Sequence, residues 1–462
     1  MKKISLLFIS LFILFEVTAQ QFLLDTLFFN GQSEKRINYV ILGDGYLEAQ
    51  LASFRQDAEQ FANDLFNTSP YKEYKNYFNV FAISVSSNEK GAAVNPDNLI
   101  DNYFGSTFNF AGIERLLVPT RGDKVIEVLA NNFPLYDQVI MLVNSPKYGG
   151  SGGWVATAST NAASSEIAIH ELGHSFANLS DEYWAGEQFA NETANMTQES
   201  STDLVKWKNW MNDLGISIIP HTGNSTWHKP HNNCKMQFLN NPFCAVCREQ
   251  FIRTTQQLIS AIDQYTPINT EKSDDPITFS ISLIVPVPNT LKVIWLLDDK
   301  KIGENVISLD LDQSLLSGES HILKASVYDS TLFDRKDSVY INTVVWNIDT
   351  TISSSIEQKL ENRKQLGIIT NVENVISDIN LNAFPNPLSN KVTIEYELKN
   401  KTHTELLIFN SEGKLTHKFL EEQQYPGTYH YEVETANYSS GLYFLVFKSD
   451  NFYKTIKMMK VD

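Results

Sequence analysis

The chain has 462 residues, of which 42% are hydrophobic and 20% charged, and its formal net charge at pH 7 is −17. This length predicts two to four domains, each large enough to bury its own core. The acidic excess argues against nucleic-acid binding, which requires basic surface, and three cysteines are too few to build a disulfide scaffold.

Residues 1–19 have the composition of a secretory signal peptide. Lys2 and Lys3 precede an apolar run over residues 4–15, and Ala19 ends a group of small residues of the kind that signal peptidase requires. The run is too short to span a bilayer. No later segment approaches eighteen unbroken apolar residues, so we predict an exported protein without a transmembrane segment.

Residues 20–270 alternate strand-like and helix-like patterns. Apolar strand patterns cover residues 38–42, 77–86 and 138–143. Between the first two, Phe54, Phe61 and Leu65 recur at the spacing of an amphipathic helix. This alternation predicts an α/β domain.

The most informative motif of this domain is the pentapeptide HELGH, which begins at His170 and ends at His174. We predict a helix here that starts near Ser164 or Ser165, either of which is a suitable N-cap. One helical turn separates the two histidines, so both imidazoles can reach a single zinc ion. Glu171 lies beside them, where its carboxylate can accept a proton from a zinc-activated water.

A catalytic zinc needs a third protein ligand and an open position. In the pattern HExxHxxGxxH the third ligand follows three residues after the glycine, but here the two positions hold Ala177 and Ser180. If the pattern is moved by one residue, Asn178 takes the turn and Asp181 follows three residues later. We therefore predict Asp181 as the third ligand, with Glu182 as the alternative; Asp181 could instead be an N-cap.

Three histidines further along the chain are another source of metal ligands: His221, His228 and His231. Any one of them could return to the zinc, although loop histidines are more often solvated or hydrogen-bonded.

The segment from His231 to Cys247 admits three interpretations. The spacings HxxC and CxxC suit a structural zinc. In an exported protein, however, a disulfide from Cys234 to Cys244 or Cys247 is favoured, and reduced buried cysteines are the third interpretation. Met236 lies where a methionine turn beneath the metal could form, although a lone methionine is more commonly part of a core.

The rest of the chain is rich in short β patterns. They cover residues 277–285, 291–296, 321–328 and 338–346, with turn residues between them. We predict an immunoglobulin-like β-sandwich over residues 271–348, a polar linker over 349–380 and a final all-β unit over 381–462.

The chain resembles the IgA-peptidase family of zinc metallopeptidases. The resemblance rests on HELGHSFANLSDEY at residues 170–183, YVILGDGY at 39–46, SPY at 69–71, and CKM with FCAVCR within 234–248. It covers about residues 36–260 and continues weakly into the sandwich. It implies a metzincin-like fold and one catalytic Zn²⁺, with His170, His174 and Asp181 as ligands and Glu171 as the general base. Specificity for immunoglobulin A does not transfer with these motifs.

The last eighty residues resemble the C-terminal sorting domain of type IX secretion substrates. The features that carry this resemblance are FPNP at residues 384–387, SGLY at 440–443 and a basic–apolar terminal strand. The resemblance implies passage through the periplasm, contact with the type IX secretion machinery, and a final location outside the cell or on its surface.

Together these features predict a secreted zinc-dependent metalloendopeptidase that acts on protein or peptide substrates. Tyr183 could add a hydrogen bond to the oxyanion or could pack beneath the site as a plain aromatic. Residues 149–155 could form a cleft edge to which an extended substrate adds as a strand. Two alternatives remain open: a catalytically inactive surface binding protein or adhesin with a zincin fold, and a zinc hydrolase that acts on a non-peptide amide or ester.

Overall fold

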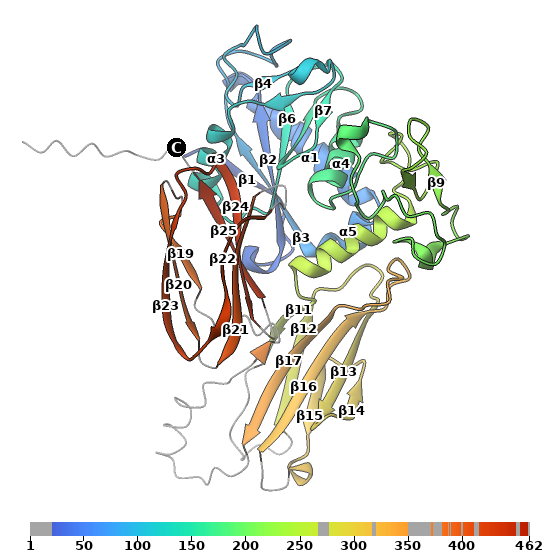
Figure 1. Cartoon of the computed structure of the whole chain (residues 1–462), viewed down its shortest axis with the longest axis vertical. Coiled ribbons are helices and arrows are strands. Elements are labelled where there is room, and N and C mark those ends of the chain that lie inside the picture. Colours follow the sequence, from blue (N-terminus) through green and yellow to red (C-terminus); the bar gives the residue numbers. More distant parts are fainter. Residues whose placement is uncertain are drawn as a thin grey trace, which may run out of the picture.

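The computed structural model describes three successive units of the chain (Figure 1). The described residues are 21–266, 277–316, 320–349, 371–372, 381–386, 388, 390–398, 401–410, 415–449 and 453–460. The predicted signal peptide and most of the predicted linker lie outside these residues. Among the described residues, no helix is both long enough and apolar enough to cross a membrane.

The first unit is built on a six-stranded mixed sheet. Its strand order is β1 (Leu23–Phe28), β3 (Phe78–Ser84), β2 (Ile37–Asp44), β6 (Gln138–Val143), β8 (Val155–Ser159) and β7 (Gly150–Ser151). The four central strands are parallel, and the edge strands β1 and β7 run antiparallel to their neighbours. The α/β class predicted for this domain agrees with this sheet.

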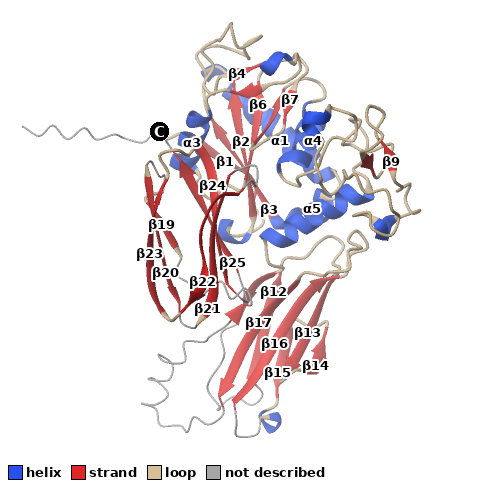
Figure 2. Ribbon diagram, viewed as in Figure 1, coloured by secondary structure: helices blue, strands red, loops and turns tan. Residues whose placement is uncertain are grey.

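Helices cover both faces of this sheet (Figure 2). They are α1 (Leu51–Asn67), α2 (Tyr71–Tyr74), α3 (Gly122–Asn132), α4 (Ser164–Ser175) and α5 (Ala245–Leu258). Because side chains alternate along a strand, Tyr39 and Ile41 of β2 enter the core beside α1, α4 and α5, whereas Val40 and Leu42 enter the core beside α3. Both cores are apolar, which explains why the central strands read as continuous hydrophobic runs.

Shorter elements complete the first unit and its loops. The short strands are β4 (Ser106–Thr107), β5 (Val118–Pro119), β9 (Ile219–Pro220) and β10 (His228–Lys229). Single 3-10 turns lie at Ser33–Lys35, Glu48–Gln50, Lys75–Tyr77, Phe110–Gly112, Glu187–Phe189, Lys208–Trp210 and, in the second unit, Gln313–Leu315. Between α4 and α5 the chain has only short strands and 3-10 turns, so most residues of this segment lie in loops.

The second unit has two antiparallel sheets around one core. One sheet has the order β11 (Ile262–Tyr265), β12 (Ile277–Leu283), β15 (Ser308–Leu311). The other has the order β14 (Lys300–Glu304), β13 (Leu291–Leu297), β16 (Ser320–Asp329), β17 (Ile341–Asp349), β18 (Asn371–Val372). Trp295 and Trp346 stack in the core with ring centroids 5.6 Å apart. Since β11 belongs to this unit, the unit starts about nine residues before the predicted boundary at 271.

The third unit also pairs two antiparallel sheets. The first has the order β19 (Asn382–Phe384), β20 (Lys391–Leu398), β23 (Gly427–Glu434). The second has the order β22 (Leu415–Gln424), β21 (Thr402–Asn410), β24 (Gly441–Ser449), β25 (Tyr453–Lys460). Tyr396, Leu406 and Phe447 lie in the core between the two sheets.

An ion pair joins the first unit to the second. The guanidinium of Arg36, just before β2, donates to both carboxylate oxygens of Asp263 in β11, at 2.8 and 3.2 Å. Only 5% of the Arg36 side chain and 24% of the Asp263 side chain are exposed. These hydrogen bonds hold the pKa of Asp263 below its usual value, although partial burial acts in the opposite direction.

Replacing Asp263 with Asn is expected to lower the free energy of unfolding by about 1–3 kcal/mol at neutral pH. Because the folded-state pKa of Asp263 is depressed, the ion pair contributes fully above the unfolded-state pKa and its contribution fades as pH falls through the folded-state pKa. Denaturant unfolding of both proteins at pH 7 and at about pH 3 measures the effect. A stability difference that does not shrink in acid would contradict this account.

Candidate metal centre

Helix α4 places His170 and His174 side by side. The two Nε2 atoms are 3.2 Å apart, and the imidazole planes are nearly perpendicular. The helix begins at Ser164, but neither serine caps it: the N-cap residue is Ala163, and Ser165 Oγ donates instead to Asp64 Oδ2 of α1 at 2.6 Å. The predicted N-cap was therefore wrong, because a side-chain contact with α1 takes the hydroxyl.

Backbone carbonyls orient both imidazoles. His170 Nδ1 lies 2.9 Å from the carbonyl oxygen of Lys235, and His174 Nδ1 lies 2.7 Å from that of Leu179. A carbonyl can only accept a hydrogen bond, so each Nδ1 carries the proton in the neutral ring and each Nε2 presents a lone pair. This is the tautomer that binds a metal through Nε2, with the second nitrogen held by an outer partner.

Asp181 completes this group of electron-pair donors. The chain reverses after α4 at Asn178, which has φ of 50°, and Leu179 N–H then donates to Gly173 O at 2.9 Å. The predicted left-handed turn at Asn178 is thus present. It brings Asp181 Oδ1 to 3.2 Å from His170 Nε2 and 3.4 Å from His174 Nε2.

The three donor atoms fit a zinc ion. A tetrahedral zinc with bonds of about 2.0–2.1 Å to N and O requires its ligand atoms to lie about 3.3 Å from one another. The observed separations are 3.2, 3.2 and 3.4 Å. Asp181 Oδ1 is buried without an assigned hydrogen-bond donor, although it faces two nitrogen atoms. A cation bound to all three atoms would satisfy Asp181 Oδ1 without a proton on either histidine.

In the metal-free protein the same closeness shifts two pKa values. Burial opposes the charge of His174, but Asp181 and Glu171 outweigh burial and raise the pKa of His174 to about 9. The two histidines lower the pKa of Asp181 well below its usual value against the effect of burial. A metal therefore has to displace a proton from this group.

The other predicted sources of a third ligand lie elsewhere. Glu182 is fully buried among the three cysteines rather than beside the histidines. His221, His228 and His231 are outside the group formed by His170, His174 and Asp181 within the described part of the chain.

For His221 we expected a loop histidine that is solvated or hydrogen-bonded, and the structure shows that it is not solvated. It is buried against Trp184, with ring centroids 5.7 Å apart. Burial, aided by the nearby charge of Lys229, lowers the pKa of His221 to about 4. His221 is therefore neutral at physiological pH.

Glu171 lies on the side of α4 that faces β7. A Cβ atom at Gly152 would approach one carboxylate oxygen of Glu171 to 3.1 Å and the Cβ of His174 to 2.8 Å. The backbone after β7 can pass this close because residue 152 has no side chain. Burial raises the pKa of Glu171, while His170, His174 and Arg115 act in the opposite direction. A carboxylate with a raised pKa is a better proton acceptor.

The free edge of β7 is partly covered by residues 115–117, which use some of its hydrogen-bonding groups. Gly150 forms a parallel bridge with Leu116, Gly150 N–H donates to Arg115 O at 3.2 Å, and Ser151 Oγ donates to Leu117 O at 2.6 Å. Of the predicted cleft edge at 149–155, the exposed backbone is therefore at Gly152 and Gly153.

Tyr183 lies next to the metal centre rather than beneath it. Its hydroxyl oxygen accepts a hydrogen bond from Arg115 Nη2 at 2.9 Å, and the guanidinium lies 5.4 Å from the ring centroid. Burial and the charge of Asp181 raise the pKa of Tyr183, with Arg115 opposing them. The phenol is therefore protonated at neutral pH: its oxygen accepts from Arg115, and its hydroxyl also interacts with the carboxylate of Asp181. Arg115 was not predicted from the sequence.

Met236 packs directly beneath α4. It is fully buried, and a Cβ atom at Gly173 would lie 2.4 Å from its sulfur. Gly173 is the residue before His174, so the methionine supports the helix at the ligand pair. The methionine turn beneath the metal stays a prediction.

Replacing Gly173 with Ala is expected to destabilise the protein by about 1–3 kcal/mol, because the added methyl group overpacks against Met236. An Ala in an ordinary helix interior would instead stabilise by about 1 kcal/mol relative to Gly. Unfolding in denaturant measures the change. In a Met236→Ala background the same replacement should no longer destabilise, and equal effects in both backgrounds would rule out the contact as the cause.

The three cysteines do not form the disulfide that we favoured from the sequence. All three are free and buried, and the sulfurs of Cys234 and Cys247 are 3.7 Å apart, far from the ~2.05 Å of a disulfide bond. His231 does not join them. Glu182 does, and with the cysteines it forms a second group of possible metal ligands. From the sequence we had considered Glu182 only as an alternative ligand beside the histidines, not as a partner of the cysteines.

Comparison with known families supports the two resemblances drawn from the sequence. Residues 26–222 match the family model IgA Peptidase M64, and residues 382–461 match the model of a secretion system C-terminal sorting domain. Residues 26–222 are therefore similar to the M64 peptidases, and the match to the sorting domain implies export to the cell surface or secretion. A comparison with curated proteins gave no match.

Similarities to solved structures are weak. PorZ, a surface component of the type-IX secretion system of Porphyromonas gingivalis, is 15% identical over 30% of this chain and 15% of its own, with a TM-score of 0.14. Dimeric latent PorU from the same organism is 12% identical over 43% of this chain and 20% of its own, with a TM-score of 0.18. The chain thus spans at most a fifth of either protein, and neither similarity supports a statement about its fold or activity.

Proposed function

We propose that the protein is a secreted zinc-dependent metalloendopeptidase, with the ion held by His170, His174 and Asp181. The observation that carries this proposal is the convergence of three electron-pair donors at the spacing of a zinc coordination sphere, beside a half-buried Glu171. The similarity of residues 26–222 to a peptidase family supports peptide bonds as the substrate.

The proposed organisation of the chain follows the same reasoning. We propose a metzincin-like catalytic domain, in which α4 carries the motif and Met236 supports it, then an immunoglobulin-like sandwich and the sorting domain. A signal peptide at residues 1–19 would start export, and the type IX machinery would complete it.

The proposed mechanism assigns a role to each residue of the site. Zinc, when bound, supplies a Lewis acid that lowers the pKa of a water and polarises the scissile carbonyl. Glu171 accepts the proton of the attacking water and returns it to the leaving amine. His170, His174 and Asp181 hold the ion, and the carbonyls of Lys235 and Leu179 keep the imidazoles in the required tautomer.

Two further contacts would position the substrate. We propose that Tyr183, with its oxygen held by Arg115, donates a hydrogen bond from its hydroxyl to the oxyanion of the tetrahedral intermediate. We also propose that the exposed backbone at Gly152 and Gly153 pairs with an extended peptide, which would place the scissile bond beside Glu171.

Digestion of an unbiased peptide library by the purified full chain tests this function. We expect internal cleavage that a chelator abolishes and that added zinc restores. Hydrolysis confined to ester or non-peptide amide probes would indicate a different zinc hydrolase. No hydrolysis by a zinc-loaded chain would indicate a binding protein.

A further inference from the structure

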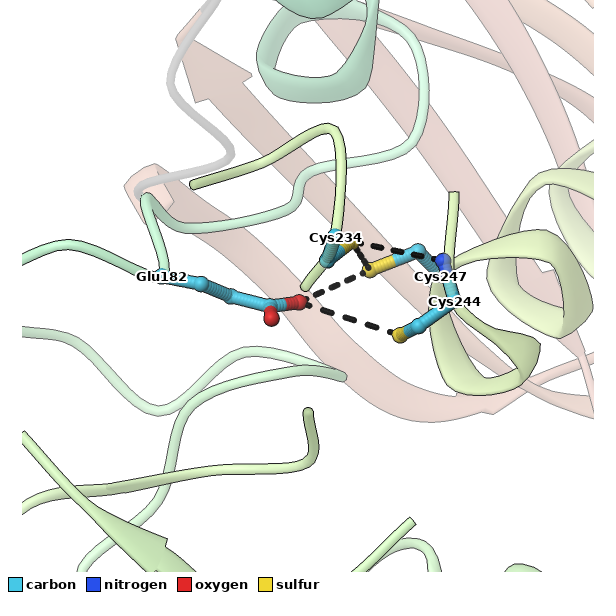
Figure 3. Close-up of side chains that lie close together, drawn as sticks. All are labelled: Glu182, Cys234, Cys244 and Cys247. Carbon is cyan, nitrogen blue, oxygen red and sulfur yellow. Dashed lines mark hydrogen bonds between the residues drawn. The ribbon is translucent and has the colours of Figure 1, made fainter. Parts of the chain in front are cut away.

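A second group of buried ligand atoms, formed by Glu182 and the three cysteines, is separate from His170, His174 and Asp181 (Figure 3). Glu182 comes from the loop after α4, Cys234 from the segment that leads to Met236, and Cys244 and Cys247 from the start of α5. One atom from each side chain lies within 4.8 Å of the corresponding atoms of the others. Glu182, Cys234 and Cys247 are completely inaccessible to solvent, and Cys244 is 7% exposed.

Three distances within this group are close to those of a tetrahedral zinc site, and all four ligand atoms lie within 4.8 Å of one another. With Zn–S bonds of about 2.3 Å and Zn–O bonds of about 2.0 Å, ideal tetrahedral geometry requires about 3.8 Å between two sulfurs and about 3.5 Å between a sulfur and an oxygen. The Cys234 and Cys247 sulfurs are 3.7 Å apart. Glu182 Oε1 lies 3.2 Å from the Cys247 sulfur and 3.8 Å from the Cys244 sulfur.

The surroundings suit an anionic cluster. The backbone N–H of Cys244 donates to Cys234 Sγ at 3.3 Å, and Asn195 Nδ2 donates to Glu182 Oε1 at 3.2 Å. The buried ammonium of Lys229 donates to the carbonyl of Glu182 at 2.8 Å and brings a positive charge to the group. The hydrogen bond to the Cys234 sulfur and the nearby cation both favour a thiolate at Cys234.

A metal-free arrangement explains the same atoms less well. Three cysteines cannot all pair, so any disulfide leaves one thiol and a buried carboxyl group behind. Glu182 Oε2 is buried without a hydrogen-bond partner, which is costly for a carboxyl group with no ion beside it. A cation that binds the three sulfurs and the carboxylate compensates for that burial.

We propose that Cys234, Cys244, Cys247 and Glu182 bind one structural zinc ion, separate from the proposed catalytic zinc. Four protein ligands leave no open position, as in zinc sites that stabilise a fold rather than catalyse a reaction. Zinc binding displaces the protons of the thiols and the carboxyl group, so no redox partner is needed.

This ion would hold together the segments that form the catalytic centre. Glu182 directly follows Asp181, and its backbone N–H donates to Met236 O at 2.8 Å. Cys234 precedes Lys235, whose carbonyl holds the His170 ring. Through Glu182 the structural zinc would fix Asp181, a proposed catalytic ligand. Through Cys234 it would fix Lys235, whose carbonyl orients His170.

Metal analysis of the purified full chain tests the proposal. We expect about two zinc ions per chain, about one in Cys247→Ser and about one in His174→Ala. Val246→Ala, a truncation of a buried side chain on the same helical turn, is the matched control and should keep both ions. In Cys247→Ser the remaining zinc should bind about 10–100-fold more weakly, the usual effect of losing outer-shell support.

Cobalt substitution separates the two sites without relying on activity. A thiolate-to-cobalt absorption band in the near ultraviolet should appear in the full chain and in His174→Ala, because only the cysteine group supplies sulfur. The band can be measured in the full chain without any variant. The experiment therefore still tests the cysteine site if Cys247→Ser fails to fold.

Two outcomes would overturn the structural zinc. One is a chain whose only zinc disappears in His174→Ala and whose cobalt form lacks the sulfur band. The other is a denatured, unreduced chain in which alkylation labels one cysteine, which indicates a disulfide. Failure of the proposed function looks different: zinc would then be lost in Cys247→Ser but unchanged in His174→Ala.

Discussion

Replacing Glu171 with Gln is expected to lower kcat for peptide hydrolysis by about 10²–10⁴-fold, the usual contribution of a positioned general base. Gln has the same size and shape as Glu but cannot accept a proton at neutral pH. The zinc content should not change, because Glu171 is not among the converging donor atoms of His170, His174 and Asp181. Cleavage rates of a peptide found in the library digest, measured beside zinc stoichiometry, check both parts.

The position of Glu171 is what makes this variant informative. Its carboxylate lies beside the backbone at Gly152, and burial raises its pKa. Glu127→Gln on α3, where the carboxylate is exposed and paired with Lys124, is a matched control that should keep full activity. If Glu171→Gln retained zinc and cleaved peptides at the parent rate, another group would have to be the base.

Local patterns explain why much of the metal centre could be predicted. The two histidines are one helical turn apart in the sequence, so any helix over residues 164–175 brings them together. Asn178 made a left-handed turn predictable, and the turn fixes how soon the next side chain can return to the helix. Asp181 is therefore close to both histidines for reasons that lie within twelve residues of sequence.

Contacts between distant segments could not be predicted in the same way. The carbonyl of Lys235 that orients His170 is 65 residues away from it, and a backbone carbonyl has no sequence signature. Arg115 reaches Tyr183 across 68 residues from a loop without periodicity. The second group of ligand atoms could not be predicted for the same reason. Glu182 comes close to the cysteines only after the chain between them has folded.

The error over the cysteines has a physical cause. Exported proteins commonly contain disulfides, and the prediction from this tendency took account of cysteines alone and not of other residue types near them. In the structure a carboxylate takes the fourth position beside three sulfurs, and Cys234 and Cys247 remain 3.7 Å apart. The spacing HxxC suggested His231 as a partner of the cysteines, whereas Glu182 is the residue that joins them.

Replacing Asp181 with Ala is expected to abolish peptide hydrolysis and to remove the catalytic zinc. Two histidines alone do not retain a catalytic zinc, and the loss of a direct ligand should weaken binding by more than the ~10–100-fold that follows from losing an outer-shell partner. Zinc titration of the metal-free variant, followed by peptide cleavage at saturating zinc, measures both effects.

A second carboxylate next to Asp181 in the sequence, that of Glu182, could in principle replace it as a ligand. Glu182 is adjacent in sequence, yet it lies among the cysteines, so it should not replace Asp181 at the histidines. Asp64→Ala is the matched control: Asp64 also contacts α4, through Ser165, but lies outside the metal group and should leave zinc binding unchanged. Unaltered zinc affinity at the histidines in Asp181→Ala would exclude Asp181 as a ligand. The buried, neutral His221 would then be the first residue to test, because Asp181 lies close enough to influence its pKa.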